Sequence, residues 1–503
     1  MLPRGAGIAG LTLAIALGRC EDPVSPIEID MYESGTEITT VGAGISVWPR
    51  TWAIMRRLGL YDELMQEAVK SKGETKKDQD EGSEHQAGPA FVFRKSDWPR
   101  EGFEFGRVMV PDGATTMHRA DMVRVLVRHL PARCTIHTSK RLVSYDPPPP
   151  SSPNDTHTLH FADGTHATAD VVIGADGIKS AVRSSMYAHT HVQECESGDD
   201  TPVAACARCA RSRPKWTGTV AYRYLIPTER LRAVNPAHHA LHVAAPMSLA
   251  DFARQHIITY LISHGKYLNW IGFVTRPGQE GTEYPHKWVL DANRDDVVRE
   301  FAGWEPEVDQ MIACVEDPTL WAIHVIDDLP FSVSGRVALM GDAVHAMTTH
   351  FGAGGGQAIE DAYLLGTLLT DPRTSPPRLP RVLEIYQAVR LPFARAVVRN
   401  ARAVGLMYEF NSPGLYAADP ARGEPTAVGV RSEEVTAAAA DGDGDGLKRR
   451  LGELERAIRG MWQWQWKEKV EEQWAEAERM MDELGSRTAP RRRRQAERWC
   501  VVA

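Results

Sequence analysis

Residues 335–345 read GRVALMGDAVH, an apolar run that contains Gly-Asp, and a cluster of glycines follows at positions 352–356. The apolar run predicts a strand buried in a sheet, and the glycines predict the start of a helix. At the end of such a strand, the carboxylate of Asp342 can accept hydrogen bonds from a sugar or polyol hydroxyl. The glycines allow backbone N–H groups to approach an anionic or electron-rich ligand at the helix N-terminus. These features together predict one corner of a ligand-binding site.

A second glycine motif, GAGIAG, occupies residues 5–10 and precedes an apolar helical run at 11–17. Gly5, Gly7 and Gly10 match the GxGxxG turn, in which glycines permit a tight bend and close approach to a pyrophosphate. A predicted strand at 27–32 ends at Glu33, in the window where an acidic residue binds a ribose hydroxyl. The motif predicts a dinucleotide site, and the alternative is a glycine-rich turn with a surface glutamate.

A third corner lies at residues 170–177, which read DVVIGADG. Another buried strand is predicted here, and it delivers Asp176 to a turn before a helix. In their order and spacing, GAGIAG with Glu33, IGADGIKSAVR (173–183) and GDAVHAMTTHFGAGGGQAIEDA (341–362) resemble single-component FAD-dependent aromatic hydroxylases of the salicylate hydroxylase-like group. The resemblance extends from about Gly5 to about Glu409.

The resemblance implies an α/β fold. A Rossmann-like FAD-binding domain of the glutathione-reductase-like type is interleaved with a β-sheet substrate domain, and C-terminal helices follow. The expected boundaries are 1–70, 106–187 and 331–410 for the FAD-binding domain, 71–105 for an insertion and substrate-side strands, 188–330 for the substrate domain, and 411–503 for a helical extension and tail. Strands in the substrate domain are predicted at 219–226, 256–262, 268–274 and 320–325 from their β-branched and aromatic content.

The resemblance also implies the chemistry. In this group NADH or NADPH passes a hydride to FAD, and the reduced flavin binds O2 as a C4a-hydroperoxide that hydroxylates an electron-rich ring. We therefore expect an FAD-dependent monooxygenase of secondary metabolism acting on a phenolic, salicylate-like substrate. Only one dinucleotide fingerprint is present, so the nicotinamide is expected to bind transiently over a shared groove. The alternatives are an epoxidase of an isoprenoid double bond and an inactive, truncated flavoprotein-like chain.

Carried over residue by residue, the resemblance implies a set of cofactor-binding residues. They are Gly5, Gly7, Gly10, Glu33, Gly44, Arg119, Asp176, Asp342 and Gly355. Gly44 lies in the loop segment VGAGI, and Arg119 in the segment HRAD at 118–121. For Arg119 the competing interpretation is an ordinary surface arginine at the start of a helix.

On the substrate side, Arg223 matches an arginine that anchors an anionic or phenolic substrate, and Tyr260 matches a tyrosine facing the same cavity. The competing interpretation of Arg223 is a strand arginine paired with surface carboxylates. His345 is equally compatible with a structural and a catalytic role.

Composition limits the partners. The formal charge of −8 argues against a nucleic-acid partner, since phosphate binding requires clustered cations. No segment is long enough to be a transmembrane helix. The basic run 491–494 is either a targeting signal or a solvated tail.

Seven scattered cysteines are compatible with a reducing compartment and a cytoplasmic protein. Cys206 and Cys209 form a CxxC, but no second pair or nearby histidine in the sequence completes a zinc set. We therefore predict a surface loop here and no metal site.

Toward the C-terminus, apolar residues recur at three- and four-residue spacing from 447 to 474 and predict one apolar helical face. The segment WQWQW at 462–466 is expected to pack against the core or against a partner chain, which makes a homodimer possible.

Two departures from the family pattern stand out. The chain begins Met1-Leu2-Pro3-Arg4 where the family has a buried apolar strand, and a misassigned start of the reading frame and a truncated product are the two interpretations of this departure. Loss of that strand would remove a central member of the sheet. Thr349 replaces a family proline that fixes the backbone beside the flavin, so we expect a looser loop and more uncoupled oxidase activity.

Overall fold

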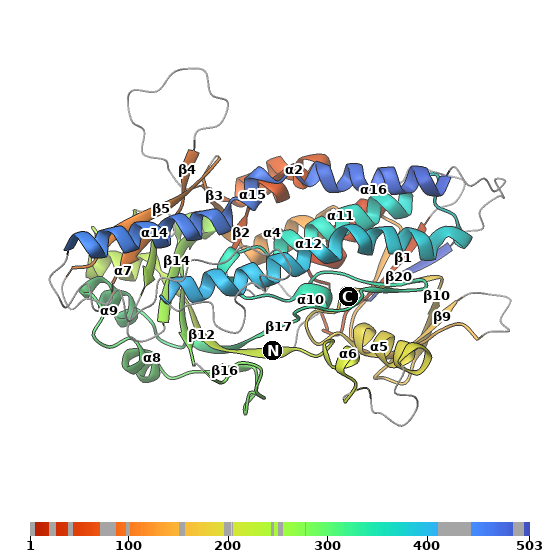
Figure 1. Ribbon diagram of the computed structural model, residues 1–503, viewed down its shortest axis with the longest axis horizontal. Helices are drawn as coiled ribbons and strands as arrows, with labels where there is room; N and C mark the ends of the chain where they lie inside the picture. The colour runs from red at the N-terminus through yellow and green to blue at the C-terminus, as the bar shows by residue number, and fades with distance from the viewer. Residues whose placement is uncertain are drawn as a thin grey trace, which may run out of the picture.

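The computed structural model describes residues 6–19, 27–38, 44–70, 87–96, 101–111, 113–149, 156–195, 203, 205–242, 246–249, 255–276, 278–410, 444–485 and 497–502. Gly5 and the basic run 491–494 lie outside these residues. The described part contains two large sheets, and helices cover them along one long side (Figure 1).

The first sheet has six strands. Their order is β18 (Val333–Ser334), β19 (Val337–Leu339), β11 (Val171–Gly174), β20 (Glu497–Val502), β1 (Ile27–Tyr32) and β7 (Cys134–His137). Strands β19, β11, β20, β1 and β7 run parallel to one another. Because a parallel sheet needs cover on both faces, the residues of β11 (VVIG) and β19 (VAL) are all buried.

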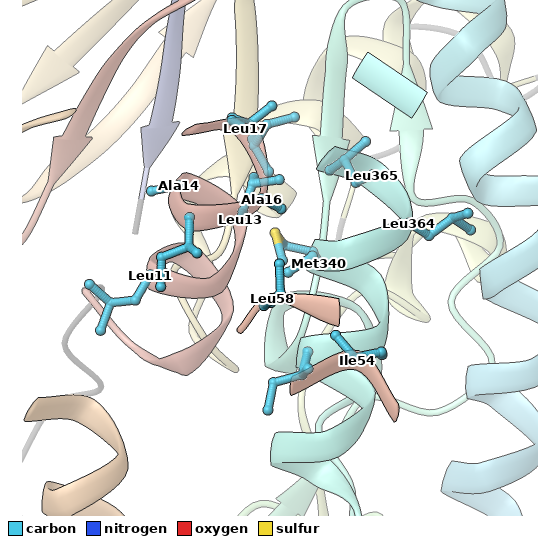
Figure 2. Packing of buried hydrophobic residues seen from close by; sticks show 14 of the residues in the cluster. Leu11, Leu13, Ala14, Ala16, Leu17, Ile54, Leu58, Met340, Leu364 and Leu365 are labelled. Carbon is cyan, nitrogen blue, oxygen red and sulfur yellow. The ribbon is translucent and has the colours of Figure 1, made fainter. Parts of the chain in front are cut away.

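Helices α1 (Ile8–Gly18) and α11 (Gly354–Thr370) pack closely over this sheet. Leu11, Leu13 and Leu17 of α1 are fully buried, which stabilises the fold by about 1.5–3 kcal/mol for each side chain. A Cβ atom at Gly366 would lie 2.6 Å from the Cβ of Ala16, so the two helices approach too closely for a larger residue. Figure 2 shows Met340 in the same cluster as the side chains of both helices.

The second sheet has eight strands. Their order is β16 (Val289–Asp291), β17 (Thr319–Val325), β12 (Lys215–Pro227), β15 (Tyr267–Thr275), β14 (Gln255–Ile262), β13 (Pro246–Leu249), β4 (Ala87–Lys95) and β5 (Phe103–Pro111). The four strands predicted between 219 and 325 are all confirmed. Three-stranded sheets complete the β structure: β10 (His166–Ala169), β9 (His157–Phe161) and β8 (Leu142–Asp146), and β2 (Gly44–Val47), β6 (Thr115–His118) and β3 (Val69–Lys70).

The other helices connect and cover these sheets. They are α2 (Pro49–Arg57), α3 (Tyr61–Glu67), α4 (Arg119–Arg128), α5 (Ala181–Glu194), α6 (Ala207–Ala210), α7 (Thr228–Val234), α8 (Arg294–Glu300), α9 (Pro306–Ala313), α10 (Asp342–His345), α12 (Leu379–Tyr408), and the short 3-10 turns η1 (His239–Leu241), η2 (Ser263–Gly265), η3 (Thr349–Phe351) and η4 (Pro376–Arg378). Among the described residues, no helix combines the length and the apolar character needed to cross a bilayer.

The apolar C-terminal pattern is divided among three helices, α14 (Gly444–Trp462), α15 (Trp464–Lys467) and α16 (Val470–Gly485). Residues of α14, including fully buried Trp462, pack with the eight-stranded sheet. Val470 of α16 packs with the core of the six-stranded sheet instead. The C-terminal helices therefore pack against the cores of both sheets of the same chain (Figure 1).

The CxxC segment differs from its prediction. Cys206 and Cys209 are buried, and they lie at the N-cap and within α6, not in a surface loop. The sulfur of Cys209 lies 3.5 Å from Nδ1 of His191, a residue of α5. The sequence prediction was wrong because the partner histidine comes earlier in the chain and is brought close only by the fold.

The C-terminal strand is a second correction. The extension at 411–503 was expected to be helical and to end in a tail, yet 497–502 form β20 between β1 and β11. This is the central position that was expected to be empty because the chain opens with Met1-Leu2-Pro3-Arg4. Pairing with β1 and β11 uses only the backbone N–H and C=O groups of the strand between them, and the distant segment 497–502 supplies these groups.

We predict that Val501→Pro destabilises the protein by about 3 kcal/mol or more. Proline removes a backbone N–H from the ladder, and a carbonyl oxygen on a neighbouring strand then loses its hydrogen bond. Val501 stands opposite Met31 of β1 and Ile173 of β11. Chemical denaturation followed by circular dichroism measures the loss. Val501→Ala, which keeps the backbone N–H, is the matched control, and equal stability of the two variants would contradict the assignment of β20.

Candidate cofactor and substrate site

The carboxyl ends of four parallel strands form one edge of the six-stranded sheet. Tyr32, Val502, Gly174 and Leu339 stand in register across β1, β20, β11 and β19. Glu33, Asp176 and Asp342 follow these strands by one, two and three residues. With about 4.8 Å between strands, the three carboxylates are spread over roughly 14 Å of sheet edge. Ligands of open α/β sheets bind at this edge.

Glu33 is buried and holds the glycine turn to the sheet. Its carboxylate accepts a hydrogen bond from the N–H of Ala6 at 2.5 Å, and another from the N–H of Gly35. Gly7 is the N-cap of α1, and Gly10 lies in the first turn of this buried helix. The predicted contact of Glu33 with a ribose stays a prediction.

Asp176 stabilises the start of α5. Its carboxylate accepts hydrogen bonds from the N–H groups of Ala181 at 2.7 Å and Val182 at 3.1 Å, and from the Ser180 hydroxyl. Ser180 in turn caps α5 by accepting from the N–H of Arg183. The carboxylate therefore orients the turn, and its contact with a pyrophosphate also stays a prediction.

Asp342 differs from the other two carboxylates because it is exposed at the start of α10. Arg119 begins α4 and is partly buried. Burial lowers the pKa of Arg119, and the charge of Asp342 acts in the opposite direction. The two residues thus come together from separate motifs, which favours the functional interpretation of Arg119 over that of a simple surface arginine.

Gly44 and Gly355 are sites of close packing. A Cβ atom at Gly44 would lie 2.3 Å from the ring of Tyr260, and one at Gly355 would lie 2.7 Å from the side chain of Ile45. Strand β2 is therefore held between α11 and the Tyr260 ring of the larger sheet. This contact joins the glycine-rich corner to the predicted substrate residues.

Arg223 and Tyr260 share one face of the eight-stranded sheet. Leu225, Asn269 and Tyr260 stand in register across β12, β15 and β14, and Arg223 is two residues from Leu225, so its side chain lies on the same face. Nε of Arg223 is buried and has no hydrogen-bond partner among the described residues. The guanidinium of Arg223 lies 5.0 Å from the ring centre of Trp321. This contact favours the substrate interpretation over the competing one, in which Arg223 pairs with surface carboxylates.

Asn269 was missed by the sequence analysis. Its side chain is buried on the same face, and both its Oδ1 and Nδ2 atoms lack a partner within the described chain. Unpaired buried polar atoms are costly, so three of them on one face point to a ligand or water that satisfies them. In the sequence, Asn269 could have been noticed as the one amide in the otherwise apolar run 268–274.

The loop 349–353 covers this face and is well anchored. Trp48 donates from Nε1 to the carbonyl oxygens of Phe351 at 3.0 Å and Gly352 at 3.1 Å. Gln465 of α15 donates from Nε2 to the same Phe351 oxygen at 3.1 Å. These bonds restrain the loop in which Thr349 replaces proline.

His345 contacts a buried carboxylate through Nε2, while its Nδ1 has no hydrogen-bond partner among the described residues, so its structural or catalytic role stays a prediction. Its Nε2 lies 2.6 Å from Oδ2 of Asp361, and both residues are buried. Burial raises the pKa of Asp361, but the charges of His345 and Arg390 outweigh burial and lower the pKa to about 2. Asp361 also accepts from the N–H of Gly341, so the network fixes the turn before Asp342.

Comparison with known proteins agrees with this geometry. The family described as FAD binding domain matches residues 5–224 and 331–401. Salicylate hydroxylase of Pseudomonas putida is 32% identical over 84% of this chain and 89% of its own. 6-Methylsalicylate 1-monooxygenase of Aspergillus terreus is 33% identical over 81% and 82%, respectively. A solved salicylate hydroxylase substrate complex is similar over 90% of this chain and 96% of that chain, with 30% identity and a TM-score of 0.66.

The strand-end carboxylates and glycine turns define a flavin nucleotide-binding protein. The chain belongs to the FAD-binding-domain family, as an FAD-dependent monooxygenase of the salicylate hydroxylase type. The predicted family, fold class and FAD cofactor are confirmed.

We predict that Asp342→Ala weakens FAD binding roughly 10- to 100-fold, because a charge-assisted hydrogen bond contributes about 1.5–3 kcal/mol. Quenching of flavin fluorescence during titration of the apoprotein measures the affinity. Asp163→Ala, which removes an exposed carboxylate in the turn between β9 and β10, is the control and should bind FAD as the wild type does. Wild-type affinity in Asp342→Ala would show that this carboxylate does not contact the cofactor.

Proposed function

We propose that the enzyme uses NAD(P)H and O2 to hydroxylate a phenolic, salicylate-like ring. The observation that carries this proposal is the buried Nε of Arg223, which has no hydrogen-bond partner among the described residues and lies on the sheet face covered by the loop 349–353. FAD supplies the chemistry that side chains lack, since it accepts hydride and then activates O2. The side chains must bind the ring, orient it and exclude water.

Arg223 is suited to hold an anionic substrate. An arginine stays protonated even when burial lowers its pKa, and its planar guanidinium matches a carboxylate. The buried Nε of Arg223 has no hydrogen-bond partner among the described residues, and the carboxylate or phenolate of a salicylate-like compound would supply one. The relatives named for acting on salicylate and 6-methylsalicylate support this chemical class.

Tyr260 and Asn269 are suited to orient the ring. Burial raises the pKa of Tyr260 to about 12, against the opposing effect of Arg223, so the hydroxyl stays protonated at working pH. A protonated hydroxyl can donate a hydrogen bond to a phenolate or carboxylate oxygen. The amide of Asn269 can both donate and accept.

Apolar side chains stand beside these residues on the same face, which favours the exclusion of water. Ile258 and Ile271 stand beside the polar residues, and they belong to one buried apolar cluster with Phe351 and Ala353 of the covering loop. Water exclusion protects an activated oxygen species from unproductive decay to hydrogen peroxide.

An epoxidase of an isoprenoid double bond is the weaker candidate. A hydrocarbon substrate would leave Arg223 and Asn269 unsatisfied in an apolar site. The alternative of an inactive, truncated chain rested on a missing central strand, and β20 occupies that position.

We predict that Arg223→Ala raises the KM for salicylate roughly 100-fold while the bound FAD stays at the wild-type level, because a buried charge contact contributes about 2–5 kcal/mol. Salicylate-stimulated NAD(P)H oxidation, with product mass, measures the effect. Arg230→Ala is the control, since this exposed arginine on α7 pairs with Glu316. An unchanged KM in Arg223→Ala would contradict the anchor role, and turnover of isoprenoid alkenes but no phenol would favour the epoxidase.

We predict that Gln465→Ala increases uncoupling about fivefold, because loss of a hydrogen bond of about 1 kcal/mol loosens the covering loop. The hydrogen peroxide released per NAD(P)H consumed measures uncoupling. Gln463→Ala is the matched control, since this neighbouring glutamine contacts Lys467 and not the loop. Equal peroxide yields from the two variants would contradict the bracing role of α15.

A further inference from the structure

Four metal-ligating residues meet outside the flavin site. His191, Cys195, Cys206 and Cys209 each place one donor atom within 4.8 Å of the others. His191 belongs to α5, and Cys195 is its C-cap one turn later. Cys206 is the N-cap of α6, and Cys209 lies within that helix. His191, Cys206 and Cys209 are buried, and Cys195 is partly buried.

The distances between the donor atoms match a tetrahedral ion. The sulfur of Cys195 lies 3.7 Å from the sulfurs of both Cys206 and Cys209. The sulfur of Cys209 lies 3.5 Å from Nδ1 of His191. Zinc bonds of about 2.3 Å to sulfur and about 2.0–2.1 Å to nitrogen place tetrahedral S–S pairs roughly 3.8 Å apart and S–N pairs roughly 3.6 Å apart.

Backbone hydrogen bonds surround Cys206. The N–H groups of Cys209 and Arg208 donate to its sulfur. The N–H of Ala210 donates to the carbonyl of Cys206 at 2.8 Å, and Ser212 donates to the carbonyl of Cys209 at 2.7 Å. Hydrogen bonds within residues 206–212 therefore fix the backbone that carries the sulfurs of Cys206 and Cys209.

A disulfide accounts for less of this arrangement. All three cysteines are free thiols, and a disulfide between any two of them would not explain why the third sulfur and the imidazole nitrogen meet at the same centre. Three sulfurs and one imidazole nitrogen within 4.8 Å of one another are the donor set of a Cys3His zinc site.

We propose that His191, Cys195, Cys206 and Cys209 bind one structural zinc ion. Binding displaces the three thiol protons to solvent and involves no redox change. The four protein ligands complete the tetrahedron and leave no open position, so the ion stabilises the fold and does not take part in the hydroxylation.

The position of this site indicates what the ion stabilises. Helix α5 begins beside Asp176, and the segment after α6 leads directly into β12, which carries Arg223. Arg183 of α5 already donates from Nε to the carbonyl of Ser212 at 2.8 Å. The ion would tie the end of α5 to the start of α6, and would thereby link the flavin corner to the first substrate strand.

The test begins with the full-length wild-type protein purified under reducing conditions. Elemental analysis after gel filtration should find about one zinc ion per chain. Cobalt added to metal-free protein should give the visible d–d absorption of tetrahedral thiolate coordination. No zinc in the purified protein, together with no uptake of added zinc or cobalt, would overturn the proposal.

Variants then locate the site. Cys206→Ser with Cys209→Ser should lose the ion and unfold at a lower temperature, whereas Cys314→Ser, which alters a buried thiol outside the cluster, should keep it. His191→Cys preserves four ligands and should still bind zinc. If the double variant does not fold, the zinc content of His191→Cys tests the proposed site instead. Full zinc content in the double variant, or loss of zinc in Cys314→Ser alone, would contradict the assignment.

Discussion

The backbone ladder between β20 and its two neighbours is the interaction on which the rest of the structure depends. It sets Tyr32, Val502, Gly174 and Leu339 in register, and that register brings the three acidic turns to one edge of the sheet. Without a strand between β1 and β11, the glycine turn and the Asp176 turn would have no common support. The cofactor site is therefore assembled by pairing between segments from opposite ends of the chain.

The sequence predicted the local elements of the fold well and its distant pairing poorly. Strand–turn–helix corners at Glu33, Asp176 and Asp342 follow from short-range patterns, and so do the strands of the larger sheet. The segment 497–502 carries no such signal, because it is short and its partners lie more than a hundred residues away in every case. It was consequently taken for the end of a tail.

The same limit applies to the sites. Arg223 and Tyr260 could be proposed from the sequence because they lie in recognisable strands, while Asn269 became a candidate only when the register placed β15 between theirs. The CxxC was recognised, but its partners His191 and Cys195 stand before it on a helix, and only the fold brings their donor atoms together. Glu33 and Asp176 also have structural hydrogen bonds to their own turns, which a motif match does not reveal.

Hydrogen exchange of the backbone amides of 497–502, followed by mass spectrometry of the full-length protein, tests the central claim most directly. If β20 is a central strand, its amides are as strongly protected as those of β1 at 27–32, because both lose protection only when the sheet opens. Rapid exchange throughout 497–502, beside slow exchange in β1, would show that the strand is not part of the sheet.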